Sequence, residues 1–485
     1  MKNFITLLLS VIILFATSNR WCASYGKLEL FTDLEQNTPV TLQYQKKANS
    51  KLITLRAKTS STGRLKFVLK GKTISKLYIT HPQNLHIKKS IYNRQAITLN
   101  TQNEYTGTIL KNKIHITDLY NLIVLFCLAY YVLWLIINPA GRELLAESRS
   151  PAKMQNMEFL RIVFTFVILF FHIKDNFHYF SLGRYGVEFF FILSGFFFTL
   201  TYDRATDIID FIKKKFIRFM PTIFFCSIVC GIFKKNINFS TMSSDWFFWT
   251  NTGLYGNSYV GSTWYISILF WVTAFYFYLL KTQRRETVNA TIALLTFLAY
   301  AACVRFGWSR LDGLGDKSNI GYMLTQSLMR GVGSIGLGFF IAQLYLNSAS
   351  QKSLFTPWQY TMIEAVVLCL PCVCMFYKPL FPNNVMLLVV CFAILIYLFA
   401  SQKGYISQFL EKCPFSKISK YTLAIYISHL CIAKPLLVYL KMPPQAFHFA
   451  SLGIVTYIAT FCIVGVLIHH LVEVPGTKMC KKWLK

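Results

Sequence analysis

Repeated apolar stretches, each long enough to cross a lipid bilayer, constrain this chain more than any other feature. A transmembrane helix needs about 20 mainly apolar residues, because the hydrocarbon core of a bilayer is about 30 Å thick. Hydrophobic residues make up 54% of the 485-residue chain and charged residues only 14%. Soluble domains carry about 25% charged residues. The sequence therefore predicts a polytopic α-helical membrane protein.

The apolar stretches predict one connector helix followed by a ten-helix core. The connector covers residues 118–138, a cytoplasmic linker covers 139–158, the core covers 159–475, and a basic cytoplasmic tail covers 476–485. The predicted spans are residues 119–138, 159–173, 186–202, 214–233, 262–280, 288–305, 322–346, 357–376, 383–400, 421–440 and 450–472.

The lysines and arginines are distributed unequally among the connections between the predicted spans. If the chain before residue 118 lies outside the cytoplasm, the connections that face the cytoplasm carry roughly twice as many lysines and arginines as the outer ones, as the positive-inside rule requires. We therefore expect a multi-pass protein of the inner (cytoplasmic) membrane with a cytoplasmic C-terminus. The net charge of +30 comes with no nucleic-acid recognition motif, so no nucleic-acid partner is expected.

The N-terminal region differs from the rest of the chain in its pattern of apolar and polar residues. Residues 1–23 read as a signal peptide, with an uncleaved anchor as the alternative. Residues 24–117 contain five short stretches in which apolar and polar residues alternate, "KLELFTDLE", "PVTLQYQKK", "KLITLRAKT", "RLKFVLKG" and "KLYITH". This spacing is typical of a small all-β sandwich, which we expect to be extracytoplasmic. Its aromatic residues are expected in the core, with glycan binding as the alternative: Phe31, Tyr44, Phe67, Tyr78 and Tyr92.

The stretch "LRIVFTFVILFFH" places an ionisable residue near each end of a span, Arg161 and His172. In a helix the two residues share nearly one face, about 20° apart, and lie roughly 16 Å apart along the axis. Ionisable groups inside a span are costly and indicate function by default. The alternatives are that Arg161 pairs with Glu158 or snorkels to the surface, and that His172 is a neutral imidazole bonded to a neighbouring helix.

The next span opens "GVEFFFILSGF". Glu188 lies near its outer end and is expected to orient His172 and hold its tautomer, unless it only faces water. Gly195 permits close approach of another helix, and Ser194 offers a hydrogen bond between helices.

These segments, together with four later motifs in the same order, resemble the acyltransferase-3 family of membrane-bound O-acyltransferases. The later motifs are "KKKFIRFMP", "STWYISILFW", "KISKYTLAIYISH" and "VEVP", so that the resemblance covers residues 155–480. Two positions depart from the family pattern. The usual Leu-Asp-Gly-Leu-Arg opening is "NMEFLR" here, and Lys420 replaces the serine before Tyr421. The N-terminal β domain lies outside the family core.

The resemblance implies transfer of an acyl group, often acetyl from acetyl-CoA, to a hydroxyl of an extracytoplasmic or lipid-linked glycan. Acyl-CoA is then the donor substrate, and no bound cofactor is expected. Because acyl-CoA is cytoplasmic and anionic, Arg161, Lys215 and Arg218 are expected to bind its phosphates. The alternative for the lysines is the positive-inside distribution alone.

His172 is within the length of an extended pantetheine arm from Arg161. We expect it to act as the general base on the acceptor hydroxyl, with an acyl-histidine intermediate as the alternative. The remaining motif residues are expected to line the active site: Ser194, Trp264, Tyr426 and His429. No metal site is expected, because the cluster Cys369, Cys372 and Cys374 has no histidine or aspartate nearby.

Two other function classes compete with this interpretation. Arginine, histidine and glutamate inside spans also suit a transporter or flippase of a lipid-linked sugar, although the sequence lacks a repeat of hydropathy between two halves. A membrane glycosyltransferase with a lipid-linked donor usually needs acidic residues in its first outer loop, where this chain has only Asp175. For the acyltransferase, the expected partners are the lipid bilayer, acyl-CoA, the glycan acceptor and proteins of glycan assembly.

Overall fold

The computed structural model divides into two compact units, residues 1–130 and 131–485. In the first unit it describes residues 25–32, 38–45, 53–60, 64–70, 73–74, 76–80, 87–92, 95–97, 99, 104–105 and 110–111. In the second it describes residues 154–173, 183–233, 238–253, 258–306, 325–348, 353, 355–376, 385–439 and 450–483. The predicted signal peptide or anchor, the connector helix and most of the linker lie outside the described residues.

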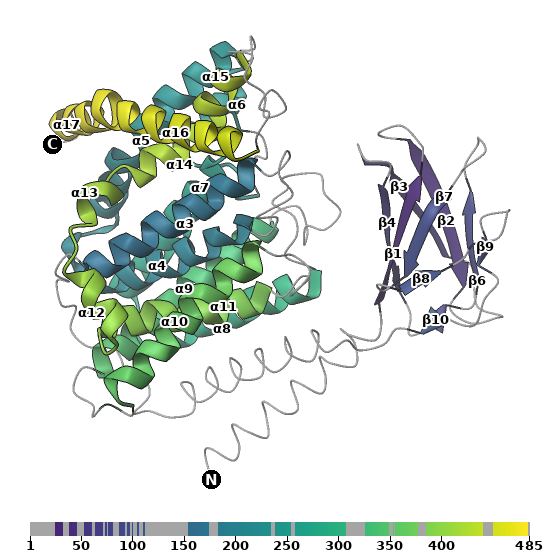
Figure 1. Ribbon diagram of the computed structural model, residues 1–485, viewed down its shortest axis with the longest axis horizontal. Helices are drawn as coiled ribbons and strands as arrows, with labels where there is room; N and C mark the ends of the chain where they lie inside the picture. The colour runs from purple at the N-terminus through teal and green to yellow at the C-terminus, as the bar shows by residue number, and fades with distance from the viewer. Residues whose placement is uncertain are drawn as a thin grey trace. The chain divides into compact units, whose positions relative to one another are not determined.

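The N-terminal unit contains two four-stranded antiparallel sheets, with strand orders β4-β1-β7-β8 and β3-β2-β6-β9 (Figure 1). A short ribbon pairs β10 with β5. The strands are β1 Tyr25–Thr32, β2 Pro39–Gln45, β3 Ile53–Lys58, β4 Arg64–Lys70, β5 Thr73–Ile74, β6 Lys76–Thr80, β7 Ile87–Tyr92, β8 Gln95–Ile97, β9 Glu104–Tyr105 and β10 Leu110–Lys111. Each of the five alternating sequence stretches forms a strand.

One apolar core joins the two sheets. Successive side chains of a strand point to opposite faces, and β2 accordingly alternates buried and less buried residues. Leu28 and Leu30 of one sheet and Leu42 of the other are fully buried in the same cluster. Tyr44 and Phe67 are core residues as expected, whereas Phe31 and Tyr78 are only half-buried and therefore were not correctly assigned to the core. A glycan-binding role for this unit, and its side of the membrane, stay predictions.

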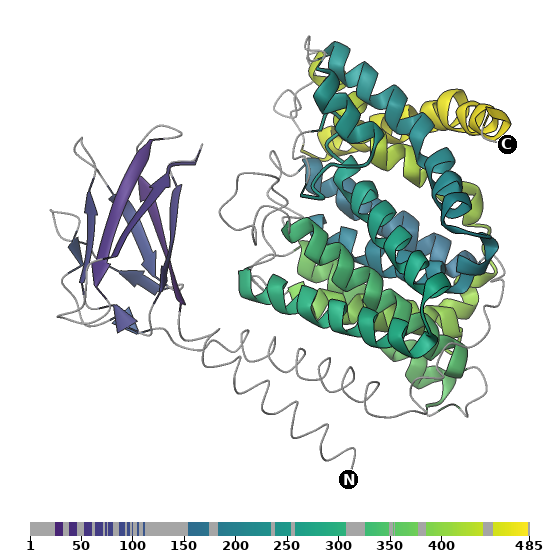
Figure 2. The same cartoon turned by 180° about the vertical axis from the view of Figure 1, so that it is seen from behind.

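The second unit is helical (Figures 1 and 2). Its main helices are α3 Gln155–Ile173, α4 Gly186–Thr201, α5 Ile208–Phe233, α7 Thr263–Thr282, α8 Arg285–Phe306, α9 Gln326–Ser348, α10 Pro357–Phe376, α11 Val385–Ser401, α14 Thr422–Ser428, α15 Lys434–Tyr439, α16 Ala450–Ile468 and α17 Val474–Trp483. Shorter helices are α6 Phe239–Trp246, α12 Tyr405–Glu411 and α13 Ser416–Ser419. Helix α3 begins inside the segment predicted as a linker.

Within the described residues, eight helices are long and apolar enough to cross a membrane, or up to nine if the bent pair α11 and α12 counts as one span. This supports a polytopic membrane protein. The eight do not include two of the ten spans expected from the sequence: the span at 383–400, where α11 is 17 residues long, and the span at 421–440. Helices α14 and α15 are separated there by a π-helical turn, His429–Ala433. A second π-helical turn, His469–Glu473, joins α16 to α17.

Apolar side chains on the outer faces of several helices are exposed, as a lipid-facing surface requires. Phe275 and Tyr278 of α7, Leu298 of α8 and Ile463 of α16 expose about half of their area. The inner faces pack through small residues. A Cβ added at Gly195 of α4 would lie 2.0 Å from the Ile335 carbonyl oxygen of α9. The backbones of α4 and α9 therefore touch, and Gly195 has the role expected from the sequence.

A buried carboxylate, Asp245, organises the segment between α5 and α7. It accepts hydrogen bonds from Ser258 Oγ (2.6 Å), Thr263 Oγ1 (2.5 Å) and the Tyr259 amide (2.9 Å). Burial raises the pKa of this carboxyl, and the hydrogen bonds from Ser258 and Thr263 oppose the rise. Asp245 thereby fixes the first turn of α7, which carries Trp264 and Tyr265.

Candidate active site

Arg161 and Glu158 form an ion pair one turn apart on α3. The distance from Arg161 Nη1 to Glu158 Oε1 is 2.8 Å, and Ser419 Oγ donates to the other carboxylate oxygen at 2.5 Å. The Arg161 guanidinium also lies 5.0 Å from the centre of the Phe197 ring. The pairing that the sequence offered as an alternative is therefore present, although about 29% of the Arg161 side chain stays accessible.

Lys215 and Arg218 of α5 lie in the same region as Arg161. Lys215 is half-buried and Arg218 is exposed. Arg218 interacts electrostatically with Arg161, which repels it, and with Glu158 and Glu473, which attract it. The structure thus brings Arg161 and Arg218 together from helices α3 and α5.

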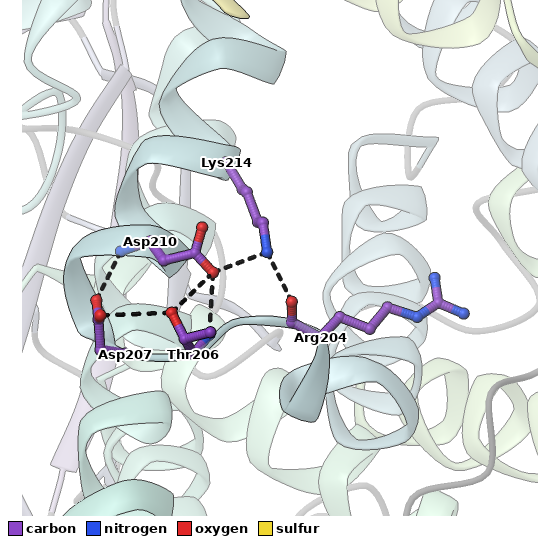
Figure 3. A network of polar contacts seen from close by, with 5 residues as sticks. All are labelled: Arg204, Thr206, Asp207, Asp210 and Lys214. Carbon is purple, nitrogen blue, oxygen red and sulfur yellow. Dashed lines mark hydrogen bonds and ion pairs between the residues drawn. The ribbon is translucent and has the colours of Figure 1, made fainter. Parts of the chain in front are cut away.

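Lys214, the neighbour of Lys215, has a different environment (Figure 3). Its Nζ donates to the Arg204 carbonyl oxygen at 2.6 Å and to Asp210 Oδ2 at 2.7 Å. Asp210 also accepts from the Thr206 amide at 3.0 Å. This network ties the segment before α5 to its first turns. Lys214 is therefore engaged in holding the start of the helix.

Tyr265 lies between the two arginines and Tyr426. Its hydroxyl is 3.1 Å from Ser194 Oγ, so the interhelical hydrogen bond expected of Ser194 is formed. Tyr265 feels the charges of both Arg161 and Arg218. On its other side, its ring centre lies 5.7 Å from that of Tyr426, whose hydroxyl donates to the Ser262 carbonyl oxygen at 3.3 Å.

His172 and His429 meet at the far end of this row. Their ring centres are 4.9 Å apart, and the ring centre of His429 lies 5.8 Å from that of Tyr426. His429 is fully buried and begins a π-helical turn, a feature that is frequent at functional sites. His172 is partly exposed, and its carbonyl oxygen accepts from Lys434 Nζ at 3.4 Å.

The tautomer of His429 is fixed by the backbone. Its Nδ1 lies 2.6 Å from the Tyr426 carbonyl oxygen. Because a carbonyl oxygen only accepts, Nδ1 carries the proton and Nε2 carries the lone pair of the neutral ring. This Nε2 is buried and has no hydrogen-bond partner among the described residues. A general base requires such an available lone pair.

Glu188 does not make the expected hydrogen bond to His172. Within the described structure its carboxylate accepts instead from Arg330 Nε and, at 2.9 Å, from Ser334 Oγ. The Arg330 and Glu188 side chains are both fully buried. The correction has a simple cause: α4 packs closely on α9, so that the carboxylate faces α9 and its arginine. Glu188 is paired with a cation that the sequence interpretation missed.

Arg330 is the principal residue that sequence reasoning missed. Its Cζ lies 5.3 Å from the ring centre of Trp264 and 5.7 Å from that of Tyr185, so Trp264 contacts Arg330. The signal was present in the sequence, because Arg330 lies inside the predicted span 322–346. The rule that singled out Arg161, that an ionisable residue within a span indicates function, applies equally to Arg330.

The described residues contain no group of three or more histidine, cysteine, aspartate or glutamate side chains arranged to hold a metal ion. The polar residues instead form one row, from Arg161 and Arg218 through Tyr265 and Tyr426 to the histidine pair. Such a row can bind an anion at one end and move a proton at the other.

One of three comparisons with known proteins gives a match. The family described as an acyltransferase domain, acyltransferase-3, matches residues 154–469, a range that contains every residue of the row. No curated protein matches the chain, and no solved structure matches it. The matched range covers most of the 485 residues and almost the whole helical unit. The chain belongs to the acyltransferase-3 family and is a membrane acyltransferase.

Proposed function

We propose that the protein is a membrane O-acyltransferase that moves an acyl group, acetyl being the first candidate, from cytoplasmic acyl-CoA to a glycan hydroxyl. The glycan is extracytoplasmic or lipid-linked. One observation carries the proposal. A pair of histidines at one end of a row of polar side chains connects, through Tyr426 and Tyr265, to two arginines at the other end.

The donor end is the group of basic side chains Arg161, Lys215 and Arg218. Arg161 has Glu158 as a counterion, so its net charge is largely balanced. Arg218 makes no direct ion pair with a described residue and is exposed. A guanidinium can bind a phosphate with two parallel hydrogen bonds. We therefore assign the strongest contact with the phosphates of acyl-CoA to Arg218, supported by Lys215 and Arg161.

The acceptor end is the histidine pair. His172 removes the proton from the acceptor hydroxyl as its oxygen attacks the thioester carbonyl carbon. The carbon–sulfur bond then breaks, and the departing CoA thiolate takes the proton from the imidazolium. The products are the O-acyl glycan and free CoA. His429 lies against His172 with its Nε2 lone pair available, so it stabilises the imidazolium or relays the proton.

The spacing along α3 suits a donor that enters from the cytoplasm. Arg161 and His172 lie roughly 16 Å apart along the helix axis, and an extended pantetheine arm spans that distance. The phosphates thus remain at the basic end while the thioester reaches the histidines. The acyl group crosses the membrane within the enzyme, and CoA returns to the cytoplasm.

Deletion of the gene tests the proposal against its competitors. The surface glycan of the parent and deletion strains is compared by mass spectrometry and NMR, before and after mild base. We expect loss of base-labile ester groups from a glycan that is otherwise complete, restored by the wild-type gene. Loss of the whole glycan would favour a flippase or a glycosyltransferase. An unchanged ester content would contradict the proposed activity.

A further inference from the structure

Arg330 occupies the centre of a fully buried polar cluster between α4, α8 and α9. Its Nε donates to Glu188, and Ser334 Oγ donates to the second carboxylate oxygen. The Tyr300 hydroxyl in turn donates to Ser334 Oγ at 3.1 Å. Arg330 and Ser334 thus both bond to the Glu188 carboxylate, and Tyr300 holds Ser334 in place. The Arg330 side chain is preorganised.

The two terminal nitrogens of Arg330 are not used by this cluster. Within the described structure, neither Nη1 nor Nη2 has a hydrogen-bond partner, and both are buried. The rings of Trp264 and Tyr185 lie beside the guanidinium. A buried donor without an acceptor is costly. The arrangement therefore fits a ligand that brings an oxygen acceptor to Arg330.

The charge of the cluster determines which kind of ligand oxygen can bind to Arg330. Glu188 already neutralises Arg330, so a fully ionised ligand such as a phosphate or carboxylate would leave an uncompensated negative charge in a buried site. A carbonyl oxygen is neutral when it binds and becomes negative only in the transition state. Hydrogen bonds that are stronger in the transition state than in the bound substrate lower the activation barrier of the reaction.

The location fits the same role. Trp264, which lies beside Arg330, follows closely after Ser262, whose carbonyl oxygen accepts a hydrogen bond from the Tyr426 hydroxyl. The Tyr426 ring contacts His429. His429 in turn contacts His172. Tyr426 thus lies between the start of α7, which carries Trp264 beside Arg330, and the histidine pair.

Resting on the proposed acyl transfer, we propose that Arg330 Nη1 and Nη2 form the oxyanion site, donating hydrogen bonds to the thioester carbonyl oxygen. As the acceptor oxygen bonds to the carbonyl carbon, the electron pair of the carbonyl moves to its oxygen, which Arg330 stabilises. When the carbonyl reforms, the carbon–sulfur bond breaks and the thiolate leaves with the proton from the imidazolium. Arg330 is a catalytic residue in this scheme, and Glu188 is its positioning residue.

The test uses the double variant Glu188→Gln/Arg330→Gln in the full-length protein. The two amides can still hydrogen-bond to each other and to Ser334, and no buried charge is left alone. We expect a thermal midpoint near that of the wild type, a kcat lower by about 10²- to 10³-fold, and a KM for acyl-CoA within about twofold. A double variant that recovers both folding and wild-type kcat would overturn the assignment, since the pair would then be structural.

Two further measurements keep the test decisive. Arg330→Lys retains the charge but loses the forked Nη donors, so it should show the same loss of kcat; if the double variant does not fold, this variant decides, and wild-type kcat in it contradicts the proposal. Slow hydrolysis of acyl-CoA without acceptor should fall by the same factor, because attack by water forms the same oxyanion. Unchanged hydrolysis would also contradict it.

The control on the same helix is Gln343→Ala. Gln343 is buried in α9 and donates to Asn289 at 3.1 Å, so its removal disturbs a buried polar contact while Arg330 keeps its surroundings. It should lower the thermal midpoint and leave kcat per folded molecule unchanged. If the wild type itself transfers no acyl group, the proposed function fails. If the wild type transfers and the Arg330 variants match it, only the oxyanion assignment fails.

Discussion

The imidazole rings of His172 and His429, from two distant parts of the chain, lie 4.9 Å apart between ring centres. The Tyr426 carbonyl oxygen fixes the proton of His429 on Nδ1, so the Nε2 lone pair is the one left to act. This pairing makes the π-helical turn at His429 part of the site, because the turn begins at that residue.

Replacement of either histidine should remove most of the activity. His172→Gln and His429→Gln are each expected to lower kcat by about 10²- to 10⁴-fold, the usual contribution of general acid–base catalysis, while the protein still folds and inserts. His470→Gln is the matched control, because His470 contacts Tyr421, which is not part of the row. The measurement is CoA release by purified protein. A loss in the His470 variant equal to those in the other two would contradict a specific role for the pair.

Arg218 and Lys214 provide a matched comparison on one helix. Arg218→Gln should raise the KM for acyl-CoA about tenfold or more, since a hydrogen bond to a charged group contributes about 1.5–3 kcal/mol. Lys214→Gln should leave that KM unchanged, because Lys214 Nζ is bonded to Asp210 and the Arg204 carbonyl (Figure 3). Initial rates over a range of acyl-CoA concentrations measure both values. Equal KM changes in the two variants would place the donor elsewhere.

The contact between α4 and α9 predicts a strong effect of one methyl group. In Gly195→Ala the new Cβ would lie 2.0 Å from a backbone oxygen, so the helices must separate, at a cost of about 1–3 kcal/mol or more. In Gly186→Ala the nearest atom is a side-chain carbon of Ile168 at 3.2 Å, which can move. Thermal unfolding in detergent should show a clearly larger fall in midpoint for Gly195→Ala. Equal midpoints would contradict the close packing.

Chemical labelling of introduced cysteines tests the orientation of the protein in the membrane. Ser240 and Gln283 are exposed residues that precede and follow helix α7. Because α7 crosses the bilayer, a cysteine at one position should react from outside and a cysteine at the other from inside. We expect Ser240→Cys to react with an impermeant maleimide on intact cells and Gln283→Cys to react only after permeabilisation. The reverse pattern would place Arg161 outside and contradict entry of acyl-CoA at that end.

Hydropathy was sufficient to locate the helices but not to choose their partners. The predicted spans at 186–202 and 357–376 correspond closely to α4 and α10, since an apolar segment in lipid has few alternatives to a helix. Gly195 and Ser194 were also assigned correctly, because small and hydroxyl residues within a span have few uses besides close contact and hydrogen bonding.

The partner of Glu188 could not be found in the same way. Its position near the outer end of a span allowed His172 or any polar group on another helix as partner, and only the packing of α4 against α9 selects Arg330. The π-helical turn His429–Ala433 within the predicted span 421–440 was missed for a related reason. A π-helical turn leaves the apolar composition unchanged, so it produces no signal in hydropathy.

The most direct test of the account is transfer of label from acyl-CoA by the purified protein in vesicles with an envelope glycan extract. With donor labelled in the acetyl group, we predict release of free CoA in equal amount to base-labile label on the glycan, and loss of both with His172→Gln. Label transfer that is unchanged by His172→Gln, or no transfer by the wild type, would contradict the account.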